Sequence, residues 1–88
     1  MKIKHLPKSH GGQVFEKEMT MLCLLARGQT SREIAGTICI SMSYVYFLAA
    51  LLKARFSVDT LAAVVSRAIA LGIISADGEL LIHLSTPK

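Results

Sequence analysis

The sequence predicts an all-α fold organised around two helices that are joined by a tight turn. In this 88-residue chain, Thr30 is expected to cap the first of these helices. Its hydroxyl can accept the amide proton of Glu33, while the Glu33 carboxylate reaches back to the Thr30 amide. Ser41 is a cap candidate for a second, longer helix after a turn at residues 39–40. A short capped helix, a turn and a longer helix form the helix-turn-helix pattern. The longer helix carries an apolar stripe at helical spacing, made of Val45, Leu48, Ala49, Leu52 and Phe56.

One further helix is predicted on each side of this motif. The first covers residues 15–27 and ends at Gly28, because glycine readily adopts the left-handed conformation that terminates a helix. The fourth covers residues 61–71, and either Asp59 or Thr60 can cap it. Both segments carry apolar residues that can contribute to a shared core, so the fold class is a four-helix domain.

The two ends of the chain differ from this helical centre. Residues 1–13 combine a proline and two glycines with basic residues, which indicates a flexible basic arm. Residues 75–88 form an extension in which an Asp-Gly pair at 77–78 predicts the turn of a short β-hairpin. The helix-turn-helix domain itself accordingly covers residues 14–74.

The composition limits the possible functions. The length allows one domain, and a net charge of +4 suits a nucleic-acid partner. Hydrophobic residues make up 52% of the chain, which is enough to expect an exposed apolar patch for association. No stretch reaches the roughly 18 apolar residues of a spanning helix, and the start lacks the apolar core of a signal peptide. We therefore expect a cytoplasmic protein with no membrane contact.

No residue pattern indicates catalysis, a cofactor or a metal. Cys23 and Cys39 lack the partner spacing of a zinc site and lie in apolar runs, so we interpret them as buried free thiols in a reducing cytosol. No Ser/His/acid or Cys/His arrangement is indicated, and there is no glycine-rich phosphate loop. We expect neither an enzyme nor a protein that binds a small molecule.

From Val14 to Ile74 the sequence resembles the LuxR/GerE-type helix-turn-helix domain. The resemblance implies a DNA-binding transcription regulator without a receiver or ligand-binding domain. Its activity would then be set by its abundance or by a partner. At Cys39 and Ser57 this family commonly has glycine or asparagine, so each residue is strained if its backbone needs a positive φ. The matching residues are Glu18, Met21, Leu22, Leu24, Leu25, Ala26, Gly28, Thr30, Glu33, Ile34, Ala35, Ile40, Ser41, Val45, Leu52, Val58, Leu71, Gly72, Ile73 and Ile74.

The resemblance also implies how double-stranded DNA would bind. The second helix of the motif would lie in the major groove, with its outward side chains toward the bases. The expected contacts are Thr30, Ser31 and Arg32 toward phosphate, Ser43, Tyr46, Phe47 and Ala50 toward the groove, and Lys53 and Arg55 beside it.

The outward side chains also support a second hypothesis. At Tyr46, Leu48 and Ala50 the resembling family commonly has more polar residues, and phosphate contacts by Lys and Arg give most protein–DNA affinity. Tyr44, Tyr46 and Phe47 together resemble a protein-contact surface, because aromatic residues are enriched at interfaces. The alternative function is therefore an interaction module that pairs with or blocks another regulator and does not itself recognise DNA. Burial of these aromatics against a neighbouring helix or the extension is a further alternative.

The fourth helix carries apolar residues on more than one of its faces. In proteins that this chain resembles, this helix commonly forms the dimer interface. The expected partner is a second copy or another regulator, and burial beneath the C-terminal extension is the alternative. The residues expected at the interface are Leu61, Val65, Ala68 and Ile69.

Overall fold

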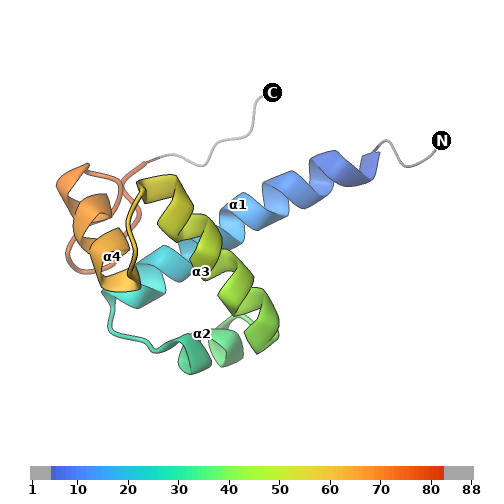
Figure 1. The fold of residues 1–88 in the computed structure, drawn as a ribbon, viewed down its shortest axis with the longest axis horizontal. Helices are drawn as coiled ribbons and strands as arrows, with labels where there is room; N and C mark the ends of the chain where they lie inside the picture. The colour runs from blue at the N-terminus through green and yellow to red at the C-terminus, as the bar shows by residue number, and fades with distance from the viewer. Residues whose placement is uncertain (1–4, 83–88) are drawn as a thin grey trace.

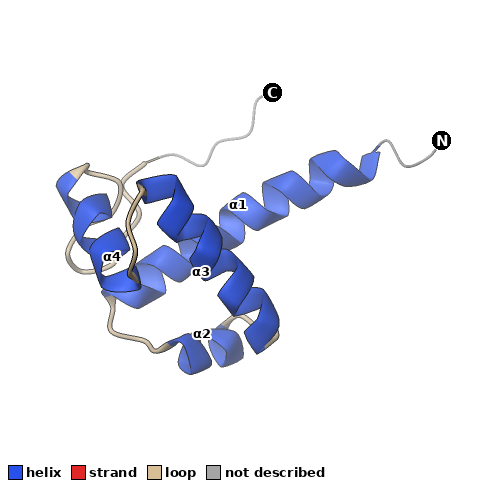
Figure 2. Cartoon of the chain, viewed as in Figure 1, coloured by secondary structure: helices blue, strands red, loops and turns tan. Residues whose placement is uncertain are grey.

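The computed structural model describes residues 5–82, with side chains from residue 14 onward. In this part of the chain the fold is all-α, as predicted, with four helices and no strand (Figures 1 and 2). Helix α3 contacts each of the other three helices and forms the centre of the bundle. The helices are α1 (His5–Ala26), α2 (Ser31–Thr37), α3 (Met42–Phe56) and α4 (Leu61–Ala70).

Helix α1 is longer than the sequence pattern indicated. It begins at His5, so the expected start at residue 15 is wrong, and residues 5–13 of the expected flexible arm are helical. Residues 1–4 of that arm lie outside the described residues. The proline lies in the first turn, where its missing N–H removes no helical hydrogen bond. Each of the two glycines disfavours the helix by only about 1 kcal/mol, which is tolerable when an existing helix is extended. This part of α1 extends beyond the other helices in Figure 1.

The two caps of the central motif are formed as predicted. The Thr30 amide donates to Glu33 Oε1 at 2.8 Å, and the Glu33 amide donates to Thr30 Oγ1 at 3.1 Å. At the start of α3, the Tyr44 amide donates to Ser41 Oγ at 3.0 Å. The chain bends by 115° between α2 and α3, within the range of helix-turn-helix motifs. Within the described residues no single helix is long and apolar enough to cross a membrane, although α2 and α3 taken together as a bent pair meet that test.

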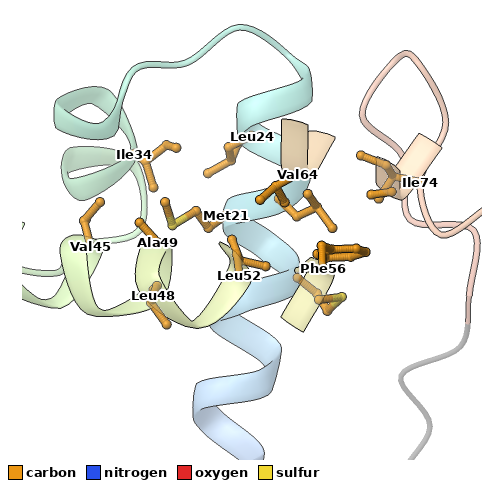
Figure 3. Close-up of a cluster of buried hydrophobic side chains, with 13 residues drawn as sticks. Met21, Leu24, Ile34, Val45, Leu48, Ala49, Leu52, Phe56, Val64 and Ile74 are labelled. Carbon is orange, nitrogen blue, oxygen red and sulfur yellow. The ribbon is translucent and has the colours of Figure 1, made fainter. Parts of the chain in front are cut away.

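The core is built around the inner stripe of α3, which is the set Val45, Leu48, Ala49, Leu52 and Phe56. All five side chains are buried, as the helical spacing predicted. Figure 3 shows these side chains gathered with Ile34 from α2 and Met21 from α1. The remaining buried apolar residues are Met19, Leu22, Leu24, Val64, Ala68 and Ile74.

Each of the four described helices ends in the same hydrogen-bonded turn. In each, an amide just past the helix donates to the carbonyl oxygen five residues earlier, as in Gln29 N to Leu24 O at 3.1 Å and Val58 N to Lys53 O at 3.0 Å. This Schellman turn requires one residue with left-handed backbone. At α1 and α4 that residue is glycine, as predicted for Gly28.

At α2 and α3 the left-handed residue is not glycine. Cys39 has a φ of 58° and Ser57 a φ of 57°. The sequence predicted strain at these two positions if their φ was positive, and both φ values are positive. A residue other than glycine with left-handed backbone costs roughly 1–2 kcal/mol, because its Cβ approaches the following carbonyl oxygen.

The segment after α4 is a turn and not the predicted hairpin. One antiparallel bridge joins Ile74 to Leu80, and no strand forms in the described residues. The Gly78 amide donates to Ser75 O at 3.0 Å, which closes the turn. Residues 83–84 of the expected second strand lie outside the described residues. A two-stranded ribbon is marginal in water, and here Ile74 instead enters the core, where it is buried.

This turn packs on the end of α1. A Cβ atom added at Gly78 would lie 2.7 Å from the carbonyl oxygen of Cys23 and 2.5 Å from Cγ of Arg27. Only glycine allows this approach, and its φ of 84° also favours glycine. The extension is therefore docked on the helices.

Candidate functional site

The outer row of α3, which is the set Ser43, Tyr46, Phe47 and Ala50, faces solvent. All four residues are exposed, with Tyr46 at 63% and Phe47 at 47%. Burial of these two aromatics against a helix or the extension is therefore wrong. The outer row lies opposite the inner stripe on the same helix, so packing of α3 into the core orients the outer row outward.

Two of the aromatic rings stack on each other. The Tyr44 and Phe47 ring centroids are 5.7 Å apart, and the ring planes differ by 13°. Tyr44 is half-buried and contacts the core, so it supports the more exposed Phe47 from one side. Stacked pairs of this kind contribute about 0.5–1.5 kcal/mol beyond area burial. The pair restricts where the Phe47 ring can lie.

Few charged groups surround the outer row. Arg32 is exposed in the first turn of α2, and Lys53 is half-buried near the end of α3. The Thr30 hydroxyl accepts the Glu33 amide proton within the cap, and Ser31 is half-buried. Helix α3 contains no carboxylate. The outer row itself is therefore uncharged, with Lys53 toward the end of α3 and, on α2, Arg32 next to the exposed Glu33 carboxylate that the Thr30 amide binds.

Arg55 has a structural partner that the sequence did not indicate. Its Nη2 donates to Glu18 Oε1 at 2.7 Å and its Nε donates to Glu18 Oε2 at 3.1 Å. The Glu18 side chain is fully buried, and the Arg55 guanidinium lies 5.2 Å from the Phe15 ring centroid. Charge-assisted bidentate pairs are among the stronger hydrogen bonds in proteins. Arg55, expected beside the DNA groove, is thus committed to holding α3 on α1.

A signal for this pair existed in the sequence. Glu18 lies three residues after Phe15 and four before Leu22, so a carboxylate interrupts the inward face of α1. A carboxylate at such a position requires a hydrogen-bonding cation, because burial of an unpaired charge is very costly. The spacing therefore indicates that Glu18 has a cationic partner, but it does not indicate which residue that partner is.

The residues expected at a dimer interface on α4 divide into two groups. Ala68 is fully buried and belongs to the core, so its assignment to an interface is corrected. Leu61 and Val65 are half-buried against the core, whereas Ile69 is 37% exposed and the following Leu71 is 61% exposed. The C-terminal turn therefore leaves the end of α4 uncovered. Val64, fully buried, is the core residue of α4 that the sequence reading missed.

A shallow hollow of about 270 Å³ lies between α1 and the C-terminal turn. Burial raises the pKa of the Cys23 thiol, and the positive charge of Arg27 partly opposes this. No cluster of three potential metal ligands occurs among the residues that the structure describes. The hollow is lined by Met19, Thr20, Cys23, Leu24, Arg27, Gly78 and Leu80.

The chain was compared with known proteins at three levels. Its sequence matches no family model and no curated protein, and its fold matches no solved structure, at the level required for significance.

Proposed function

We propose that this protein is a DNA-binding transcription regulator of the LuxR/GerE helix-turn-helix type. The observation that supports this most is the arrangement of α2 and α3. Both helices are capped, they meet at a bend of 115°, and α3 buries one face while exposing the other. Insertion of the second helix of such a motif into the major groove needs an exposed outer face of this kind. A cytoplasmic location is part of the same proposal.

The phosphate contacts in this proposal are few. Arg32 and Lys53 are the basic residues beside the outer row that have no ion-pair partner in the described residues, with Ser31 nearby. Arg55 is left out because Glu18 balances its charge. With about two or three phosphate contacts, affinity should fall by roughly one to two orders of magnitude between 50 and 200 mM salt.

Fluorescence anisotropy with a labelled DNA duplex at low salt tests this function. The double change Arg32→Ala and Lys53→Ala should weaken binding and reduce its salt dependence. Arg67→Ala is the matched control, because Arg67 is also exposed but lies on α4. Absence of binding at the lowest salt would overturn the proposal. Equal weakening by the control would show that net charge, and not this face, attracts the DNA.

Dimerisation through the end of α4 is part of the proposal. Ile69 and Leu71 form an exposed apolar pair there, available to a second copy or to another regulator. Ile69→Glu should then give a monomer with an unchanged helical circular-dichroism spectrum. A wild-type protein that sediments as a monomer at high concentration would contradict a homodimer.

A second candidate function is a helix-turn-helix module that contacts another regulator. The specific observation in its favour is the outer row, which carries two exposed aromatics and no charge, while Arg55 is committed to Glu18. Capture of a partner from native extract, with and without nuclease, separates the two functions. A partner that survives nuclease and is lost in a Tyr46→Ala, Phe47→Ala variant would support the module. Loss of all captured material on nuclease treatment would support DNA binding.

A further inference from the structure

We infer that the outer row of α3 recognises the C5-methyl groups of pyrimidines in the major groove of duplex DNA. Thymine carries this methyl group naturally, and 5-methylcytosine carries it at the same ring position. The inference rests on the proposed DNA-binding function and specifies what the exposed face would distinguish.

The side-chain chemistry of the outer row excludes most direct recognition of bases. Bidentate recognition of guanine uses Arg or Lys, recognition of adenine uses Asn or Gln, and cytosine donates to Asp or Glu. The outer row has none of these side chains. Its hydroxyls, on Ser43 and Tyr46, can bond to any base pair. The remaining feature of the major-groove floor is the thymine methyl group, and Phe and Ala are side chains that contact it.

The geometry gives Phe47 a fixed position for such a contact. The parallel Tyr44 ring supports it at 5.7 Å, and half-buried Tyr44 is anchored against the core. A ring held in this way loses little conformational freedom when it binds, which favours affinity. Ala50 lies one turn further along the same side of α3 and is exposed. Together they present an apolar surface about one helical turn long.

The charges near the outer row favour DNA as the occupant of this face. The groove of DNA has phosphates along both walls and methyl groups on its floor. The motif has Arg32 on α2 and Lys53 on α3, and the apolar outer row carries no charge. No carboxylate of α3 would repel the phosphates. The apolar centre and basic flanks of the motif correspond to the floor and walls of the groove.

The experiment compares two duplexes of one sequence, one containing thymine and one containing deoxyuracil throughout. Deoxyuracil lacks only the methyl group, so binding by the wild-type protein at low salt should weaken by about fourfold for each methyl buried. A third duplex with 5-methylcytosine in place of cytosine should bind more tightly than its unmethylated form. Phe47→Ala should reduce these differences, because the ring makes the larger contact, whereas Arg67→Ala should preserve them.

Each outcome has a distinct meaning. Equal binding of the thymine and deoxyuracil duplexes by the wild type would overturn the inference and leave the proposed function intact. No binding of any duplex would overturn both. If Phe47→Ala weakened both duplexes by the same factor, the ring would not contact the methyl groups, and the inference would fail. Deoxyuracil also changes DNA shape, and this affects the wild type and Phe47→Ala equally. Comparing the thymine-to-deoxyuracil affinity ratio between the two proteins therefore cancels the effect of shape. Thermal unfolding of the variant checks that its fold is retained.

Discussion

The inner and outer faces of α3 are both largely apolar, yet only one of them contributes to the core. Leu48 and Leu52 on the inner stripe are fully buried, whereas Tyr46 and Phe47 on the outer row are exposed. The position of a residue around the helix, and not its hydrophobicity, therefore determines its burial. Because the outer row adds little to folding, its apolar character points to a partner outside the monomer. The following predictions test this division.

The largest expected effect is on the inner face. Leu52→Ala should lower the free energy of unfolding by about 3–5 kcal/mol, because it removes a fully buried side chain and leaves a cavity. Tyr46→Ala on the outer face should change it by no more than about 0.5 kcal/mol. Urea unfolding monitored by circular dichroism measures both. A large loss for Tyr46→Ala would mean that the outer row does contribute to the fold.

The second expected effect is a difference in stability between variants of two basic residues near the end of α3, Arg55 and Lys53. Arg55→Ala should destabilise the protein by about 2–3 kcal/mol, because it leaves the buried Glu18 carboxylate without its partner. The value lies below that for a fully buried pair because the Arg55 side chain is 47% exposed, so water can reach the site. Lys53→Ala, by comparison, should stay within about 0.5 kcal/mol.

A DNA-binding measurement on the same two variants completes this test. Lys53→Ala should weaken duplex binding without loss of stability. If Arg55→Ala left stability unchanged and abolished DNA binding, Arg55 would belong to the outer face after all, as the sequence alone suggested.

The third effect is a gain in stability at the boundaries of the motif. Ser57→Gly should raise the free energy of unfolding by about 1 kcal/mol, because glycine adopts the left-handed backbone without strain. Cys39→Gly should act in the same direction. Ser43→Gly is the matched control within α3 and should instead lower stability by about 0.5–1 kcal/mol. Differential scanning calorimetry distinguishes the opposite signs.

The smallest expected effect is a difference in reactivity between the two thiols, because one is exposed and the other is partly buried. Cys39 is exposed, so the expectation that both thiols are buried is wrong for it, whereas Cys23 is partly buried and burial raises its pKa. Less Cys23 is therefore thiolate at a given pH, and iodoacetamide should alkylate Cys39 first. The raised pKa also means that the stability contributed by the protonated Cys23 thiol is present below its ordinary pKa of 9.0 and is lost as the pH rises above it. Mass spectrometry of partly alkylated native protein checks the order of modification.

Features with a local cause could be predicted from the sequence. The caps at Thr30 and Ser41 depend on residues three positions away, and the inner stripe of α3 depends on helical spacing. For Cys39 and Ser57 the resemblance predicted strain only on the condition of a positive φ, and both residues have one. These features involve only neighbours in the chain, so a single sequence contains the information they need.

Features that depend on distant contacts were missed or wrong. Glu18 and Arg55 are 37 residues apart, and no periodicity links them. The expected hairpin is replaced by a docked turn, because Ile74 enters the core and Gly78 approaches the end of α1. Helix α1 begins earlier than the sequence pattern predicts, because a long helix can include the proline and glycines that disfavour helix formation by themselves. For the candidate site, the sequence predicted that the outer row is exposed, but it did not predict that Arg55 pairs with Glu18.

The left-handed residues at the ends of α2 and α3 affect how the motif moves. Cys39 lies in the turn between α2 and α3, and Ser57 directly follows α3, so the two left-handed residues belong to the turns that bound this helix. Unfolding of α3 together with these two turns would relieve both at once, which lowers the free energy of local opening by about 1 kcal/mol at each residue. The helix that we propose enters the groove is thus also a unit of local unfolding, and its amide hydrogens should exchange together. In the Cys39→Gly, Ser57→Gly variant that exchange should slow.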